Sequence, residues 1–278
     1  MNAGGISRAL RAARMLGPSF EALVGTGAGV VVCVVATAPL VSGKLTEVGV
    51  AGAAAVAAAA AALGAAVARW LTRGLGAAAA VGQGLTMGGL AGLVSQSAVV
   101  NIAGGRWLAL ASGLTAGVAS ALVVPRRPRP DVLRPLEQAE DAERPRWRDW
   151  ARAAAVGAVG GVLYGWLASV CHPTQQGVSL QVAVLLMPFA VGLSTGLATR
   201  HPRVAHLLVV AGAAELATRL VVAGMGTVPY PPRVEGTQPH VATAATVVAL
   251  YAVAAGLALL GWASTACRPA SREPARHA

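Results

Sequence analysis

Long apolar segments separated by short polar ones constrain this chain more than any other feature. A helix of about 20 apolar residues spans the hydrocarbon core of a bilayer. Segments of this kind recur at residues 22–42, 46–68, 75–99, 106–125, 151–171, 178–199, 204–224 and 241–263. The sequence therefore predicts an all-α fold, a polytopic membrane helix bundle with about eight transmembrane helices.

Composition agrees with a membrane environment. Hydrophobic residues make up 55% of the chain and charged residues 12%, whereas a soluble domain carries about 25% charged residues. The net charge of +11 would suggest a nucleic-acid partner in a soluble protein, but here the arginines lie in loops and tails. We expect the lipid bilayer as a partner and no nucleic acid.

The arginines alternate between successive loops. The segment 126–150 contains seven arginines, whereas "CHPTQQG" at 171–177 contains neither arginine nor lysine. Cytoplasmic loops are enriched in Lys and Arg. The alternation predicts that both termini are cytoplasmic, and the dominance of arginine over lysine suggests the cell membrane of a bacterium with a GC-rich genome.

The arginine- and proline-rich segment divides the chain. We expect transmembrane halves at 22–125 and 151–263 joined by a cytoplasmic linker at 126–150. An amphipathic segment at 1–21 predicts an interfacial helix before the first span, and 264–278 forms a cytoplasmic tail. Because each half has four spans, any internal repeat would be parallel rather than inverted.

Glycines recur at four-residue spacing within four of the spans, so each set forms a groove on one helix face. Grooves of small residues let neighbouring helices approach closely in lipid. Packing inside the bundle is the favoured interpretation, and a contact between copies is the alternative. The helix-packing glycines are Gly84, Gly88 and Gly92 in one span and Gly157, Gly161 and Gly165 in another.

Signatures of soluble enzymes fail on inspection. The segment "SGKLT" at 42–46 resembles the end of a phosphate-binding loop, but Leu45 replaces the required Ser or Thr. No H-E-x-x-H motif occurs. Cys171 and His172 could bind a soft metal, but their spacing matches no ligand pattern. The sequence predicts no catalytic residue, cofactor or metal site, and an enzyme is not favoured.

Glu215 and Arg219 interrupt an otherwise uncharged span. A charged side chain at the bilayer centre costs at least about 2.5–3.5 kcal/mol. Glutamate followed by arginine four residues later is a favourable pairing on a helix, so we expect a mutually neutralising pair facing the bundle interior. Its role is either a structural anchor, a substrate, ion or proton site, or a contact with another membrane subunit.

Uncharged polar residues accompany the pair. Gln83, Gln96 and Gln181 are expected to line a polar path with it, and Pro188 is expected to kink its helix. Discontinuous helices line the sites of many transporters. The sequence thus favours a transporter- or permease-like protein. The alternative is a non-catalytic membrane subunit or anchor that docks a cytoplasmic partner through its arginine-rich loop. An enzyme acting on a lipid-linked substrate is a third possibility.

Overall fold

The computed structural model describes residues 3–41, 49–72, 75–99, 104–124, 147–170, 178–199, 203–225 and 244–266. Side chains are described within these ranges except at 3–16, 41, 168–170, 178–185 and 266. The described residues form α-helices and one short 3-10 helix, η1, with no β-strand among them. The elements are α1 (Ala3–Val41), α2 (Val50–Leu71), α3 (Ala77–Ser95), η1 (Gln96–Val99), α4 (Gly105–Val123), α5 (Trp147–Val170), α6 (Val178–Ala198), α7 (Val204–Gly224) and α8 (Ala244–Ala266).

Each predicted span corresponds to one helix, which confirms the helical-bundle prediction. Within the described residues, six helical segments are long and apolar enough to cross a membrane: Gly17–Leu40, Val50–Leu71, Ala77–Val99, Gly105–Val123, Val204–Gly224 and Ala244–Thr265. In α6, the residues with described side chains include the apolar stretch Leu186–Ala198. The chain has the architecture of a multi-pass membrane protein.

Several helix boundaries differ from the expectation, including the start of α2, which lies at Val50 and not at 46. Helix α1 runs without a break from Ala3 to Val41, so the expected interfacial segment and the first span form one helix, with Pro18 inside it. Helix α5 begins at Trp147, four residues earlier than expected. Asp149 lies in its first turn, where a carboxylate is stabilised by the positive end of the helix dipole. Residues 126–146 of the expected linker lie outside the described residues.

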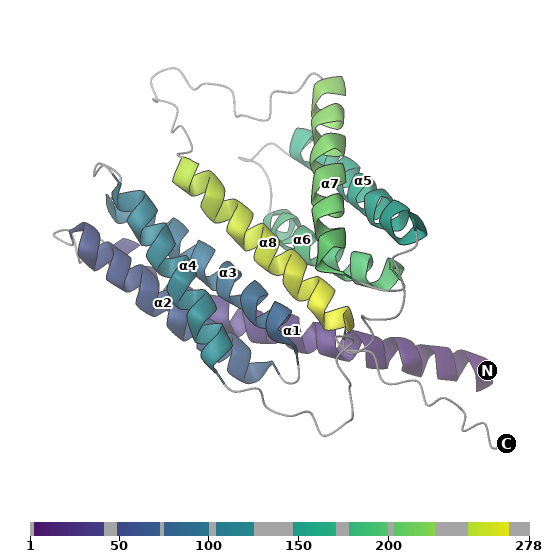
Figure 1. Ribbon diagram of the computed structural model, residues 1–278, viewed down its shortest axis with the longest axis horizontal. Helices are drawn as coiled ribbons and strands as arrows, with labels where there is room; N and C mark the ends of the chain where they lie inside the picture. The colour runs from purple at the N-terminus through teal and green to yellow at the C-terminus, as the bar shows by residue number, and fades with distance from the viewer. Residues whose placement is uncertain are drawn as a thin grey trace.

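Helices α1 to α4 form one bundle together with α8, the last helix in the sequence (Figure 1). Helix α8 packs along α3, and Leu257 and Leu260 of α8 share a buried core with Leu75 and Ala79 beside the start of α3. At one end of this bundle the hydroxyl groups of Ser19 and Ser264 are 2.9 Å apart. The C-terminal helix therefore completes the packing of the N-terminal half.

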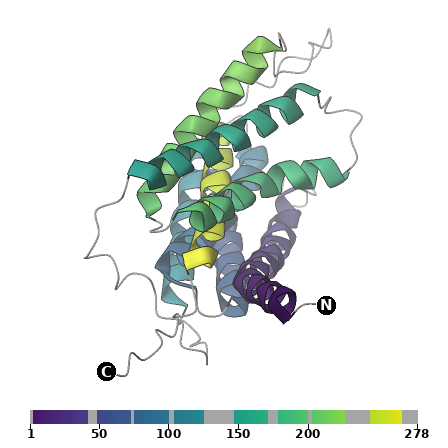
Figure 2. The same cartoon turned by 90° about the vertical axis from the view of Figure 1, so that its right-hand side faces the viewer.

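Helices α5, α6 and α7 lie beside this bundle (Figure 2). Helix α6 packs against α8, while α5 packs mainly along α7. Helix α7 is the least covered of the six apolar segments. Only 11% of its apolar window is buried, compared with 28% for Gly105–Val123 and 61% for Ala77–Val99.

The recurring glycines lie where helices approach most closely. A Cβ atom built on Gly88 of α3 would be 2.6 Å from the carbonyl oxygen of Gly113 in α4. On α5, Gly157, Gly161 and Gly165 face Val210, Ala214 and Thr218 of α7 in the same order. This constant offset means that α5 and α7 run parallel, as two helices that start on the same side of a membrane do.

Candidate functional site

Glu215 and Arg219 form the ion pair that their spacing predicts. The Nε of Arg219 donates a hydrogen bond of 2.8 Å to Oε1 of Glu215, one turn earlier on α7. Both side chains are exposed, at 77% for Arg219 and 47% for Glu215. The pairing is therefore present, but the expected position inside the bundle is not: the pair lies on an outward-facing side of α7.

The packing of α7 explains this orientation. Val210, Ala214 and Thr218 face the glycine groove of α5, and Oγ1 of Thr218 donates a hydrogen bond of 3.0 Å to the carbonyl oxygen of Gly161. Glu215 and Arg219 each follow one of these residues by a single position, and one position rotates a side chain by about 100° around a helix. Close packing against α5 thus turns the pair away from α5.

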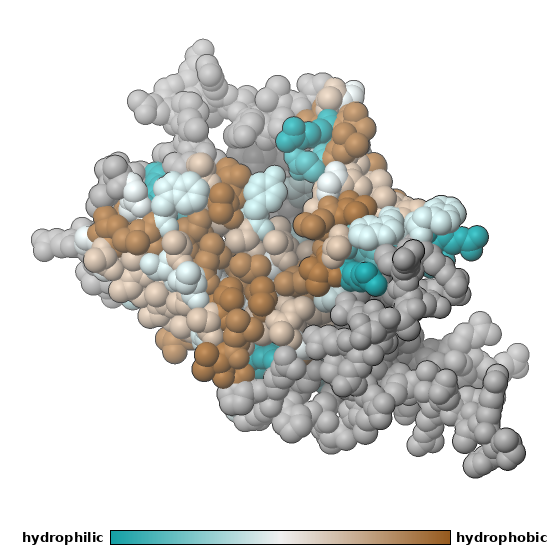
Figure 3. Space-filling model, in the orientation of Figure 1, coloured by the Kyte–Doolittle hydropathy of each residue, from teal (hydrophilic) through white to brown (hydrophobic). Residues whose placement is uncertain are grey.

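The exposed face of α7 is apolar around the pair. Leu208, Leu216 and Leu220 are 76%, 62% and 65% exposed. Figure 3 shows hydrophilic surface on α7 bordered by hydrophobic surface. Scattered leucines suit lipid, but a carboxylate and a guanidinium at this depth do not. The exposed face of α7 is therefore apolar except for the Glu215–Arg219 ion pair, which lipid tails solvate poorly.

Helix α8 contributes one polar group near the pair. Tyr251 is close enough to Arg219 to interact with it electrostatically. This tyrosine is 62% exposed, and α7 and α8 make little direct contact. Arg219 and Tyr251 are thus both largely exposed, on two helices that make little direct contact.

The glutamines expected to share a polar path with the pair lie elsewhere. Gln83 is fully buried between α2 and α3, where its Nε2 donates hydrogen bonds to Thr72 Oγ1 (2.8 Å) and to the carbonyl oxygen of Ala68 (3.3 Å). It ties two helices of the first bundle together. The structure does not bring it to α7.

Gln96 lies at the other end of α3, in η1. Its Nε2 donates to the carbonyl oxygen of Ala245 (3.3 Å), and its Oε1 accepts a hydrogen bond from Thr246 Oγ1 (2.9 Å). It therefore fixes the start of α8 and does not meet the charged pair. The side chain of Gln181 lies outside the described residues. Helix α6 continues through Pro188, and a kink there stays a prediction.

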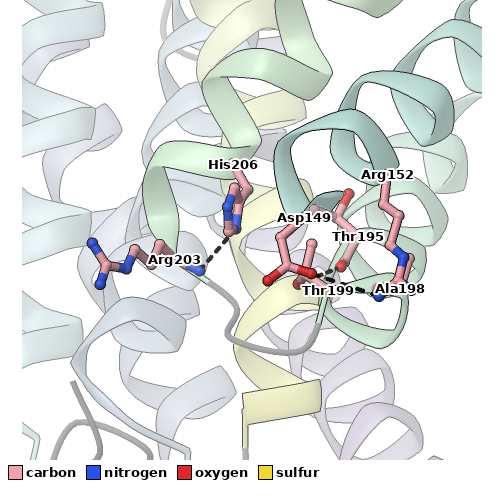
Figure 4. A network of polar contacts seen from close by, with 7 residues as sticks. All are labelled: Asp149, Arg152, Thr195, Ala198, Thr199, Arg203 and His206. Atoms are coloured by element: carbon pink, nitrogen blue, oxygen red, sulfur yellow. Dashed lines mark hydrogen bonds and ion pairs between the residues drawn. The ribbon is translucent and has the colours of Figure 1, made fainter. Parts of the chain in front are cut away.

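A polar cluster that the sequence analysis missed joins α5, α6 and α7 (Figure 4). Asp149 and His206 are buried, at 3% and 0% exposure. The backbone N–H of Arg203 donates a hydrogen bond of 3.1 Å to Nδ1 of His206. Nη1 of Arg152 lies 3.6 Å from Oδ1 of Asp149 and donates to the carbonyl oxygen of Ala198 at 3.4 Å.

An aromatic contact completes the cluster. The rings of Trp150 and His206 pack edge to face with centroids 4.5 Å apart. The groups come from the first two turns of α5, the start of α7 and the last turn of α6, so the cluster holds these helix ends together. The expected start of the fifth span at residue 151 had placed Asp149 and Trp150 in a loop. The acidic residue directly before an apolar helix was the available signal for an earlier start.

No family model and no curated protein matches the sequence, and no solved structure matches the fold. Among the residues that the structure describes, no group of three or more His, Cys, Asp or Glu side chains is arranged to hold a metal ion. The functional argument therefore depends on the geometry of the helices themselves.

Proposed function

We propose that this chain is a subunit of a membrane assembly and that it contacts its partner through the exposed face of α7. Its setting is the cell membrane of a bacterium, with both termini in the cytoplasm. The observation that carries the proposal is the exposure of the Glu215–Arg219 ion pair in the middle of an apolar helix.

Contact with a partner protein is energetically more favourable for the exposed face of α7 than contact with lipid alone. A single charge at the bilayer centre costs about 2.5–3.5 kcal/mol on insertion scales. Pairing within α7 offsets much of this cost, but the remaining donors and acceptors of the pair still require polar partners. A neighbouring membrane helix with polar groups of its own supplies such partners, whereas lipid tails do not.

Site-specific photo-crosslinking tests the proposal. A photoreactive residue replaces Leu220 on α7, which is 65% exposed, or Val35 on α1, which is 66% exposed and serves as the matched control. We expect a protein adduct from position 220 and lipid adducts alone from position 35. Lipid adducts alone from both positions would contradict a role in assembly.

Transport is the second candidate, and Tyr251 is the observation that favours it. Arg219 and Tyr251 lie near one another on two helices that make little direct contact, which is an arrangement suited to a polar opening. If this opening conducts a solute, water reaches it. A membrane-impermeant maleimide should then modify Leu220→Cys from outside in intact cells, and failure to react there would contradict the transport hypothesis.

A further inference from the structure

We propose that the partner of this face is a second copy of the chain. Two α7 helices pair in parallel, and each Arg219 binds the carboxylate of Glu215 in both copies. This inference rests on the proposed assembly role. It adds the identity of the partner and the atoms that join the two copies.

Membrane insertion fixes the relative orientation of the helices. Two copies of one chain insert with the same orientation, so their α7 helices run parallel about a two-fold axis along the membrane normal. In such a contact residue i of one copy meets residue j of the other, and j meets i. Corresponding residues lie at the same depth, so Glu215 of one copy is level with Glu215 of the other.

The guanidinium of Arg219 reaches the membrane depth of Glu215 because of the direction in which helical side chains point. Side chains on an α-helix point toward its N-terminus. The guanidinium of Arg219 accordingly lies beside the carboxylate of Glu215, with a bond of 2.8 Å through Nε. In the paired state two guanidinium groups and two carboxylates therefore lie at one depth, and the four charges sum to zero.

The hydrogen-bonding capacity of arginine fits a second carboxylate. A guanidinium has five N–H donors, and the bond to Glu215 uses the one on Nε. The two Nη atoms carry the other four N–H groups, which can bind a carboxylate in a bidentate manner. Because both partners of the pair are 47–77% exposed, a second copy can reach them without a rearrangement of α7.

The exposed face of α7 also allows the backbones of the two α7 helices to approach each other closely. Gly212 lies one turn before the pair, and no described heavy atom lies within 4 Å of a Cβ atom built there. At Gly157 and Gly161 of α5, by contrast, backbone atoms of α7 occupy the space next to the glycine. Small residues on exposed helix faces let helices associate in lipid. Leu216 and Leu220, which are exposed on the same face, would pack around the charged centre.

The charge pattern favours a second copy over an unrelated partner. An unrelated helix needs a separate set of opposite charges at the matching depth. A second copy supplies that set automatically, because glutamate and arginine lie on the same face at a spacing that the arginine side chain spans. The face is self-complementary, which is the requirement for a two-fold contact.

Charge reversal in two copies tests the pairing. Copies carrying two different affinity tags are expressed together, solubilised in mild detergent and purified through one tag. We expect wild-type copies to co-purify. Glu215→Arg places two positive residues on each helix and Arg219→Glu two negative ones, so each variant alone should co-purify with itself at least 10-fold less.

Mixing the two variants gives the decisive result. A copy carrying Glu215→Arg beside a copy carrying Arg219→Glu restores every opposite-charge contact between chains, although each helix alone carries like charges. Co-purification of the mixed pair to near the wild-type level supports reciprocal ion pairs. A mixed pair no better than either variant alone overturns the reciprocal pairing. Absence of wild-type co-purification overturns the second copy as partner.

Disulfide trapping keeps the proposal testable if the reversed variants fold poorly. In a background with Cys33→Ala, Cys171→Ser and Cys267→Ser, we expect Gly212→Cys to form a covalent dimer on oxidation. Gly27→Cys on α1 is the matched control, because Gly27 is equally open and should stay monomeric. No dimer from position 212, or equal dimer from both, overturns the proposal. Photo-adducts from position 220 to another protein would then leave the assembly role intact.

Discussion

At the scale of single residues, Glu215 and Arg219 share one hydrogen bond on an exposed face, so removal of either leaves the other unpaired. Glu215 is short and lies near the middle of its helix, whereas the longer Arg219 can reach toward the membrane surface. We expect Arg219→Gln to lower abundance and thermal stability more than Glu215→Gln, because it leaves the carboxylate unpaired near the middle of the helix.

The double variant Glu215→Gln/Arg219→Gln is the control for this prediction. It removes both charges, so abundance and thermal stability in membranes should return close to the wild-type values. Its co-purification with a second copy should stay low, because the contacts between chains are lost. Two harmless single substitutions would show that each charge reaches water independently and that the pairing has no energetic role.

His206 is central to the polar cluster that joins the starts of α5 and α7 to the end of α6. It is fully buried and packs against Trp150, so His206→Ala removes an aromatic contact and leaves a cavity. We expect a loss of about 2–3 kcal/mol in unfolding free energy, measured by thermal unfolding in detergent. Arg152→Ala is the control: its side chain is 49% exposed, and it should cost at most about 1 kcal/mol. Equal effects would contradict a packing role for His206.

At the scale of helices, the sequence predicts features that lie within one helix. It does not predict which helices contact one another. Apolar length predicts each span, and four-residue spacing predicts the ion pair of α7. Neither property specifies which side of α7 faces a neighbour, since that depends on the glycine groove of α5. For the same reason the sequence pattern groups Gln83 and Gln96 with the charged pair. Their hydrogen-bond partners on α2 and α8 follow from tertiary packing alone.

The glycine contacts give a test at this scale. Gly88→Ala should destabilise the bundle strongly, because its Cβ would meet the backbone of Gly113 at 2.6 Å and backbone cannot move aside as a flexible side chain can. Gly161→Ala should do the same at Ala214. Gly27→Ala is the matched control: it has open space and should be neutral or stabilising by up to about 1 kcal/mol. Unchanged thermal stability of both central variants would show that these contacts do not hold the helices together.

At the scale of the whole molecule, the fold agrees with an even number of crossings. Helices α5 and α7 run parallel, and the beginning of the apolar part of α1 meets the end of α8 at Ser19 and Ser264. The first and last helices therefore have their terminal ends on the same side. The distribution of arginine predicts that this side is cytoplasmic, and this prediction is independent of the packing.

Cysteine accessibility tests the assignment in intact cells. In the background without native cysteines, Gln176→Cys should react with a membrane-impermeant maleimide, because the positive-inside rule places residues 171–177 outside. Gln138→Cys, in the arginine-rich segment 126–150, should react only after the membrane is permeabilised. The reverse pattern would invert the topology while leaving the helix packing intact. Reaction at both positions in intact cells would place both segments on the outer side, so α5, the one helix between them, would not cross the membrane and the count of eight spans would be wrong.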